Sequence, residues 1–308
     1  MTRLHGERGQ STVVVVLFMT VILGMAAAVL DVGSWFRADR AVQQAADAAA
    51  LAGAHALPGN TSQASSLALS YSDKNGGGVL DADISFSTTQ LTNDTISVRA
   101  RRPAPGFFAR LFGVNSVTVD ATAKARAGVA GAARWAAPFG VDERHRLISG
   151  TSPSTGKTCP CFSEATDLGL QRVGPGAFRV INIDGSQGGT SPPTIASWIQ
   201  YGYSGYMPID WYFSDPGARF NSSSIQSALN TRIGKVILLP IYREVIGSGA
   251  NAEYHVVGFV GFRITGYTIN GSRDAYLYGH FETITWDGIM SESGSDRDYG
   301  AHVIELID

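Results

Sequence analysis

The sequence predicts an α+β protein: an N-terminal transmembrane helix that extends into an Ala-rich rod, a small α+β domain, and a β-rich C-terminal domain. Three observations predict this. They are an uncharged run at 13–30, a Pro-free and Ala-dominated segment at 34–57, and long apolar stretches separated by Gly, Asn and Ser at 235–307. We expect a cytoplasmic leader at 1–12 and a transmembrane helix at 13–33. The rod and α+β domain should occupy 34–130, and a loop-rich and β-rich extracytoplasmic domain should occupy 131–308.

The run at 13–30 has the length and composition of a membrane-spanning helix. As a helix it would span about 27 Å, close to the roughly 30 Å of a bilayer's hydrocarbon core. Eleven of its eighteen residues are Val, Ile, Leu or Phe, which together favour insertion by roughly 3–6 kcal/mol. A cleaved signal peptide is the alternative, because Ala26 and Ala28 form an A-x-A-like step. The helical pattern continues past that step, so the sequence favours a retained anchor.

Composition favours a single-pass protein of the cytoplasmic membrane with its N-terminus inside and its large domain extracytoplasmic. Two Arg flank each side of the apolar run, so the positive-inside rule does not choose an orientation. Lys is scarce, whereas Gly, Ser and Thr are abundant. Cys159 and Cys161 would form a disulfide outside the cytoplasm, with free thiols or pairing to another chain as alternatives. The net charge of −2 and the lack of a basic stripe give no reason to expect a nucleic-acid partner.

The segment at 34–57 continues the helix beyond the membrane. Ala has the highest helix propensity, and Pro58-Gly59-Asn60 supplies a stop, so anchor and extension could form one helix of about 45 residues. Small side chains recur at helical spacing and permit close helix approach. This face could pack on the protein's own domain or on a partner subunit. Its candidate residues are Val42, Ala45, Ala49, Ala52, Gly53 and Ala56.

The rest of the chain alternates between helical and extended patterns. Helices are predicted at 62–74, 107–112 and 195–201. Strands are predicted at 84–87, 95–100 and 117–125, with a break at 103–106 that contains Pro103 and Pro105. Pro residues mark 131–230 as loop-rich, with one strand at 178–183. The last zone reads as a β-sandwich or barrel-like unit, with strands at 236–242, 254–267, 275–286 and 302–307.

Motifs for nucleotide or metal chemistry are incomplete. The segment at 150–158 resembles a phosphate-binding loop, but it has five residues between Gly150 and Gly156 where four are needed, and Cys159-Pro160-Cys161 follows it. We therefore expect a polar loop and no bound nucleotide. The segment at 295–300 resembles part of a calcium loop but lacks the distal Glu, so a solvated turn is favoured over a calcium site. We predict no metal and no cofactor.

Two further clusters have both a functional and a structural interpretation. His280 and Glu282 would share one strand face, where such a pair can be an acid–base device or a plain polar contact. We favour the contact and therefore predict that the chain is not an enzyme. Aromatic residues between 198 and 213 could form a ligand surface or pack in the core, and we favour the core. The candidate surface residues are Trp198, Tyr201, Trp211 and Tyr212.

Several N-terminal motifs resemble the TadG-like (TadE/TadG family) proteins of the Tad/Flp pilus assembly system. The likeness covers residues 1–130 well and 131–235 poorly, and it rests on the segments at 8–10, 31–35, 44–54, 98–103 and 107–114. It implies a membrane-anchored accessory of a type IV-like pilus or secretion system, with membrane lipid and other pilus-assembly or pilin-like proteins as partners. A surface adhesin that binds a host, glycan or matrix ligand is the alternative, and a membrane-tethered hydrolase is less favoured.

One position departs from the pilin-like members of the wider system. Those proteins carry a Glu five residues after the Gly where the leader is cut, and counting from Gly9 that position is Val14. In a pilin stack the Glu would pair with a neighbour's amino terminus inside the lipid. Val14 cannot form this pair. We therefore expect an uncut anchor with an external domain, and not a processed and polymerising pilin.

Overall fold

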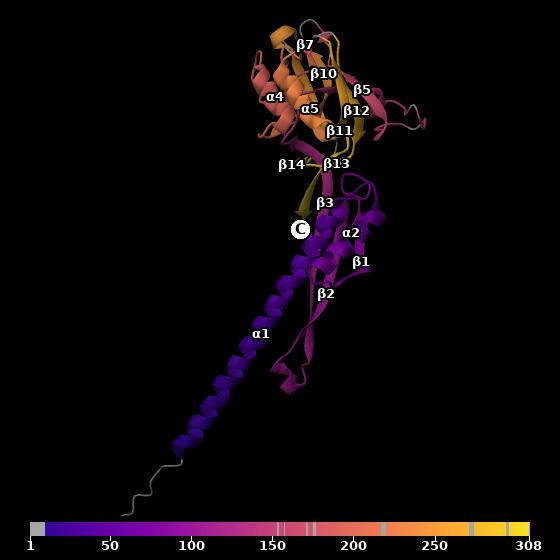
Figure 1. Ribbon diagram of the computed structural model, residues 1–308. Helices are drawn as coiled ribbons and strands as arrows, with labels where there is room; N and C mark the ends of the chain where they lie inside the picture. Colours follow the sequence, from indigo (N-terminus) through magenta and orange to yellow (C-terminus); the bar gives the residue numbers. More distant parts are fainter. Residues whose placement is uncertain are drawn as a thin grey trace, which may run out of the picture. The chain divides into compact units, whose positions relative to one another are not determined.

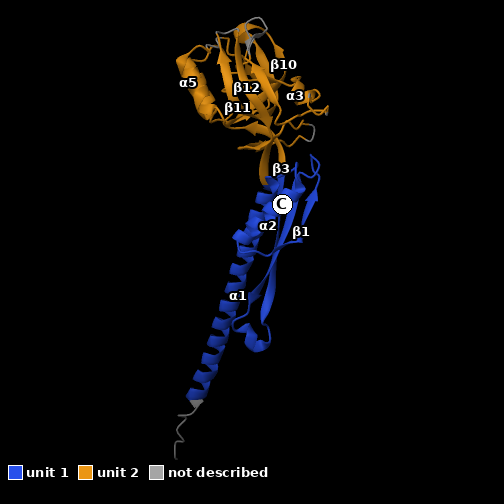
Figure 2. Ribbon diagram, turned by 45° about the vertical axis from the view of Figure 1, so that its right-hand side comes forward, with its two compact units in different colours: residues 1–126, 306–308 blue, residues 127–305 orange. Residues whose placement is uncertain are grey.

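The computed structural model describes residues 10–307, apart from 153, 157, 171, 175–176, 217–219, 271–273 and 294–295 (Figure 1). Most of the expected leader therefore lies outside the described residues. The chain forms two compact units, coloured separately in Figure 2. Unit 1 contains residues 1–126 and 306–308, and unit 2 contains residues 127–305. A long N-terminal helix and β-rich sheets confirm the predicted α+β class.

Helix α1 (Gln10–Ala54) is a single helix of 45 residues, as the sequence predicts. It is long and apolar enough to cross a membrane. Its large apolar side chains between Val13 and Leu30 are exposed, whereas Val42 and the Ala residues at 45, 46, 49 and 50 are fully buried. The first half of α1 thus offers an apolar surface to its surroundings, and the second half belongs to the core of unit 1.

The remainder of unit 1 packs against this second half. Helix α2 (Thr61–Lys74) begins at Asn60, whose side-chain oxygen accepts a hydrogen bond from the Gln63 N–H at 2.9 Å. Three antiparallel strands follow in the order β1-β2-β3. They are β1 (Val79–Ser87), β2 (Thr95–Pro105) and β3 (Ser116–Ala133), and both α2 and β2 contact α1.

Strand β2 does not stop where the sequence predicts a break. It continues through Pro103 and Pro105, which pair with Thr118 and Ser116 of β3. Strand β1 pairs with β2 only as far as Ala100, so the prolines lie where β2 has a single neighbour. A proline without an N–H is tolerated at such an edge. The β2–β3 hairpin therefore extends beyond β1 and runs beside α1 in both views (Figures 1 and 2). The short 3₁₀ helix η1 (Ala109–Phe112) forms its tip.

Unit 2 is built on a six-stranded sheet in the order β4-β10-β11-β12-β5, with β9 paired to β11. Neighbours in the centre are antiparallel, and β4 is parallel to β10. The bounds are β4 (Val141–Asp142), β5 (Ala165–Gly169), β9 (Trp211–Phe213), β10 (Val236–Ile246), β11 (Glu253–Ile269) and β12 (Ala275–Glu282).

Both faces of this sheet are buried, which explains the continuous apolar run at the start of β10. Ile237, Leu239 and Ile241 belong to one core cluster together with Ile199 of α4 (Pro192–Tyr201) and Leu229 of α5 (Ser223–Arg232). Leu238 and Tyr242 belong to a second cluster. This cluster also contains residues from β3, β8 (Met207–Pro208), β14 (Gly288–Met290) and β15 (Ala301–Ile307), as well as from α4, β9 and β11.

The prediction of a strand at 178–183 is wrong. Strand β7 (Ala177–Phe178) pairs with β6 (Arg172–Gly174), and the residues after it form only isolated bridges at Val180 and Ile181. The strand predicted at 275–286 is also divided. Strand β12 ends at Glu282, and β13 (Ile284–Thr285) then pairs with β15. Helices α3 (Arg146–Ser149) and α5 and the 3₁₀ turn η2 (Gly249–Asn251) were not predicted.

A larger side chain on α1 should destabilise unit 1 when it replaces Gly53 and should have less effect when it replaces Gly33. A Cβ atom at Gly53 would lie 2.5 Å from Ile96 Cδ1 and 3.1 Å from the Ala64 carbonyl oxygen, whereas a Cβ at Gly33 meets nothing within 4 Å. We expect Gly53→Leu to cost about 1–3 kcal/mol of unfolding free energy. Gly33→Leu on the same helix is the matched control and should cost less. Thermal unfolding in detergent, followed by circular dichroism, compares the two, and equal losses would contradict this packing.

Candidate functional site

The small-residue face of α1 packs inside unit 1. Val42, Ala45 and Ala49 are fully buried, and Ala52 and Gly53 are buried too. Ala56 lies just past the helix end and is half-buried. The absent side chain at Gly53 lets β2 and α2 approach α1 closely, as its neighbours Ile96 and Ala64 indicate. Of the two interpretations of this face, the structure therefore favours packing on the protein's own domain.

A buried carboxylate connects α1 to the tip of the β2–β3 hairpin. Asp31 is only 3% exposed and accepts hydrogen bonds from the backbone N–H groups of Phe107 (2.7 Å), Phe108 (3.0 Å) and Ala109 (2.5 Å). These three donors lie at the start of η1, where free N–H groups and the helix dipole favour an anion. Trp35 adds a second link, because its Nε1–H donates to the Pro105 carbonyl at 3.2 Å.

Sequence reasoning missed this contact. Asp31 entered the sequence analysis only as part of the motif at 31–35, with no partner assigned to its carboxylate. The partners are 76 to 78 residues away in the sequence, so no local spacing reports them. A usable signal was the segment at 106–113, in which two Gly residues frame a short apolar stretch. Gly106 lies close to the Val114 carbonyl, and Gly113 has a positive φ of 85°, so both allow the tight turn.

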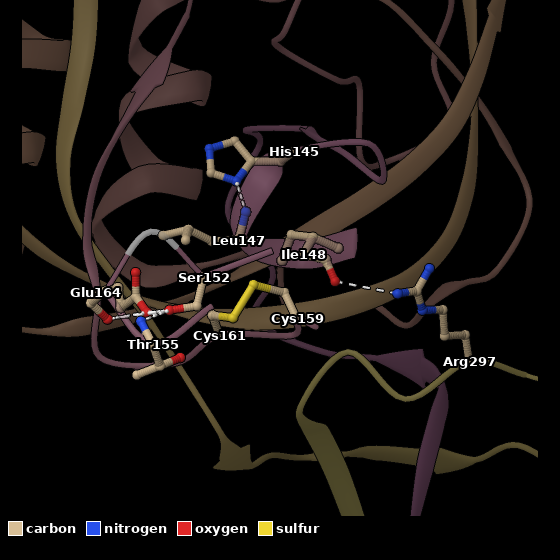
Figure 3. Close-up of a disulfide and its surroundings, with 10 residues drawn as sticks. His145, Leu147, Ile148, Ser152, Thr155, Cys159, Cys161, Glu164 and Arg297 are labelled. Atoms are coloured by element: carbon tan, nitrogen blue, oxygen red, sulfur yellow. Dashed lines mark hydrogen bonds between the residues drawn. A yellow bond between two sulfur atoms is a disulfide. The ribbon is translucent and has the colours of Figure 1, made fainter. Parts of the chain in front are cut away.

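Cys159 and Cys161 are joined in a disulfide in unit 2 (Figure 3). The bridge lies beside α3, since the Cys161 N–H donates to the Leu147 carbonyl at 2.9 Å. Nearby, Ser154 donates to Glu164 at 2.7 Å, and Ser152 donates to the same oxygen. Residues 153 and 157 of the phosphate-loop-like segment lie outside the described residues. In the described part of this segment, Thr151 and Thr158 form an isolated antiparallel β-bridge that joins the two ends of the loop. The segment does not lead into a helix.

The four aromatic candidates do not form one surface. Trp198 and Tyr212 are buried in the second core cluster of unit 2, and the Tyr212 hydroxyl donates to the Pro208 carbonyl at 2.8 Å. Trp211 stacks on His255, with ring centroids 4.7 Å apart. Tyr201 at the end of α4 is 65% exposed. Two of the four side chains therefore serve packing, and one is covered by a neighbouring ring.

His280 and Glu282 share a strand face, but an arginine holds the carboxylate. Arg263 on β11 donates to Glu282 from Nε at 2.5 Å and from Nη2 at 3.0 Å, and His280 Nε2 lies 2.9 Å from the same carboxylate. The hydrogen bond from Arg263 lowers the pKa of Glu282. A carboxylate stabilised in this way is a weak general base. The arrangement is therefore a cross-strand ion pair between β11 and β12.

The calcium-like segment is engaged in local contacts where it is described. Residue 295 lies outside the described part. Asp298 accepts from the Gly300 N–H at 2.7 Å and lies 3.0 Å from His302 Nε2, and Asp296 accepts from Ser291. Among the described residues, no group of three or more His, Cys, Asp or Glu side chains is placed to hold a metal ion.

Glu143 is a charged centre of unit 2 that sequence reasoning missed. It accepts from Arg243 Nε at 2.7 Å and from the Tyr299 hydroxyl at 2.8 Å, and Arg297 lies 3.6 Å away. The hydrogen bond from Arg243 lowers the pKa of Glu143. Its partners follow 100 and more residues later in the chain, so the cluster joins β10 to the segment before β15. This role is structural.

Comparison with known families bears on helix α1. Residues 9–56 match the family model described as "Tad: Putative Flp pilus-assembly TadE/G-like". The chain carries a TadE/G-like segment at its N-terminus. This segment coincides with α1 and ends two residues after it, so it includes both the apolar half and the packed half of the helix. No curated protein and no solved structure gives a significant match to the chain.

Acid should remove the stabilisation that Glu143 provides. Its folded pKa lies below the ordinary value of 4.5, so its contribution is present above that pH and is lost as the pH falls through the folded pKa. We expect Glu143→Gln to lower the unfolding free energy by about 1–3 kcal/mol at pH 7. The difference from the natural chain should shrink below pH 4. Thermal unfolding across pH 3–7 measures this, with the exposed Glu292→Gln as control. A constant difference would contradict it.

Proposed function

We propose that this chain is a single-pass, membrane-anchored accessory of a Tad/Flp type IV-like pilus or secretion system that acts through protein–protein contacts. The observation that carries the proposal is the coincidence of the TadE/G-like segment with α1. The family segment is the helix that exposes an uncharged apolar surface between 13 and 30. Such a surface is stable in lipid and costly in water.

The large domain is placed outside the cytoplasm in this proposal, with the N-terminus inside. The disulfide between Cys159 and Cys161 supports that orientation, because disulfides persist in oxidising compartments. Residues 34–130 would then form the rod and α+β domain, of which residues 34–56 belong to the matched segment, and residues 131–308 would form the external β-rich domain that contacts pilus components.

A polymerising pilin fits the helix less well. Val14 is exposed on α1 and has no charge with which to pair a neighbour's amino terminus. The first acidic residue of α1 is Asp31, and its carboxylate is already satisfied by the hairpin tip. A surface adhesin gains little support either. Of its four candidate aromatics, Trp198 and Tyr212 are buried, and Trp211 stacks on His255.

Charges in the apolar half of α1 should release the protein from the membrane. Each Arg near the centre of a spanning helix costs about 2.5–3.5 kcal/mol. Two of them, in Leu17→Arg with Ile22→Arg, would therefore offset the insertion energy of the run. We expect the double variant to move from the carbonate-washed membrane fraction to the soluble or aggregated fraction. Leu80→Arg, at an exposed site on β1, is the control and should stay in the membrane.

A deletion strain separates assembly from adhesion. If the chain is an assembly accessory, the strain should lack pili by electron microscopy. The natural chain should restore them, and the double Arg variant should not. Normal pili combined with lost surface attachment would instead favour the adhesin. In that case Tyr201→Ala, at the exposed aromatic of the four, should reproduce the loss of attachment.

A further inference from the structure

The tip of the β2–β3 hairpin exposes large apolar side chains beside the membrane helix. Leu111 and Phe112 are 83% and 87% exposed, and Phe107 is also well exposed. Exposed apolar clusters of this kind are rare on soluble surfaces and mark a membrane or partner contact. The tip is held at Asp31, the residue that ends the apolar run of α1.

An apolar groove of about 770 Å³ lies between the tip and α1, next to their contact at Asp31. On the helix side it is lined from Thr20 to Trp35, and on the tip side by Phe108, Ala109, Leu111 and Phe112. Thr20 lies eleven residues before Asp31, which corresponds to about 16 Å along a helix. The tip side chains therefore share a groove with helix residues that lie well inside the apolar run.

The polar side chains that line the groove have partners within unit 1. The Thr20 hydroxyl donates to the Val16 carbonyl at 2.9 Å, and Trp35 Nε1–H donates to Pro105. The Asp31 carboxylate is occupied by the three N–H groups of the tip. A groove with its polar groups already satisfied suits hydrocarbon and offers little to a polar ligand.

We propose that residues 107–114 form a second membrane-inserted element, which enters the leaflet on the side of the folded domain, and that a lipid acyl chain fills the groove. This inference rests on the proposed membrane anchoring of α1. Lipid is the occupant because the groove is continuous with the apolar surface of α1, which the bilayer already surrounds. Arg110, exposed at the tip, would place its guanidinium among the lipid phosphates.

The Asp31 contact has a specific task in this arrangement. Backbone N–H groups that enter hydrocarbon without a partner are costly. The Asp31 carboxylate accepts the free N–H groups at the start of η1, and the tip in turn compensates a carboxylate at the edge of the apolar run. The carboxylate of the helix and the N–H groups of the hairpin thus satisfy each other's hydrogen bonds where both elements would enter the lipid.

Fluorescence quenching in vesicles tests the insertion. The full-length chain is reconstituted in phosphatidylcholine vesicles with an NBD fluorophore on Leu111→Cys, and the vesicles contain lipids with a nitroxide at acyl carbon 5. Both native cysteines are in a disulfide and are not labelled. We expect severalfold quenching at position 111. Leu80→Cys, which is exposed on β1 of the same unit, is the control and should not be quenched. Phe112→Cys provides a second site at the tip.

A probe on Leu17→Cys distinguishes failure of this inference from failure of the anchoring proposal. Quenching at 17 without quenching at 111 and 112 overturns the inserted tip and leaves the anchor intact. No quenching at 17 overturns both. Blue-shifted emission at 111 without lipid quenching means that a protein partner covers the tip, and this also overturns the proposal. Asp31→Ala should reduce quenching at 111 severalfold while leaving position 17 quenched, and unchanged quenching at 111 would remove Asp31 from the explanation.

Discussion

One continuous helix must be stable in two different environments, and the rest of unit 1 depends on this constraint. The first half of α1 exposes Val, Leu, Ile and Phe side chains, whereas its second half buries Val42 and a series of Ala residues. No Pro and no charge interrupts the helix between 13 and 30. Side-chain size changes along the helix: large apolar residues are exposed on the first half, and small residues on the second half let α2 and β2 approach closely.

Asp31 lies where these two environments meet. A carboxylate at the edge of an apolar run would be costly without partners. Its bonds to the tip of the hairpin remove that cost and fix where the tip lies along α1. The extension of β2 through Pro103 and Pro105 makes the contact possible, because it carries the hairpin past the end of β1. The position of the apolar tip beside α1 therefore depends on both the extended hairpin and the contact with Asp31.

Features set by local pattern could be predicted from the sequence, and features set by long-range contacts could not. The Ala-rich segment and the stop at Pro58 predicted the extent of α1, and the apolar run after Lys235 predicted β10. Helix α5 was not predicted, because its three buried residues Ile225, Ala228 and Leu229 stand among polar ones and give a weak apolar pattern. The Asp31 and Glu143 contacts join residues that are 76 to 156 positions apart. The burial of Trp198 and Tyr212 likewise depends on strands far away in the chain, so the sequence alone left both core packing and a ligand surface open for these aromatics.

Spin labels along α1 in reconstituted vesicles test whether the first half of the helix lies in lipid while the second half lies in the folded domain. Labels at positions 17 and 22 should collide more often with oxygen, which partitions into lipid, than with a water-soluble nickel complex. A label at Gln43, which is exposed on the packed half of the same helix, should show the reverse. The preference for oxygen over nickel should therefore change sign between positions 30 and 43. Higher nickel accessibility at 17 and 22 would contradict it, because the apolar half of the helix would then lie in water.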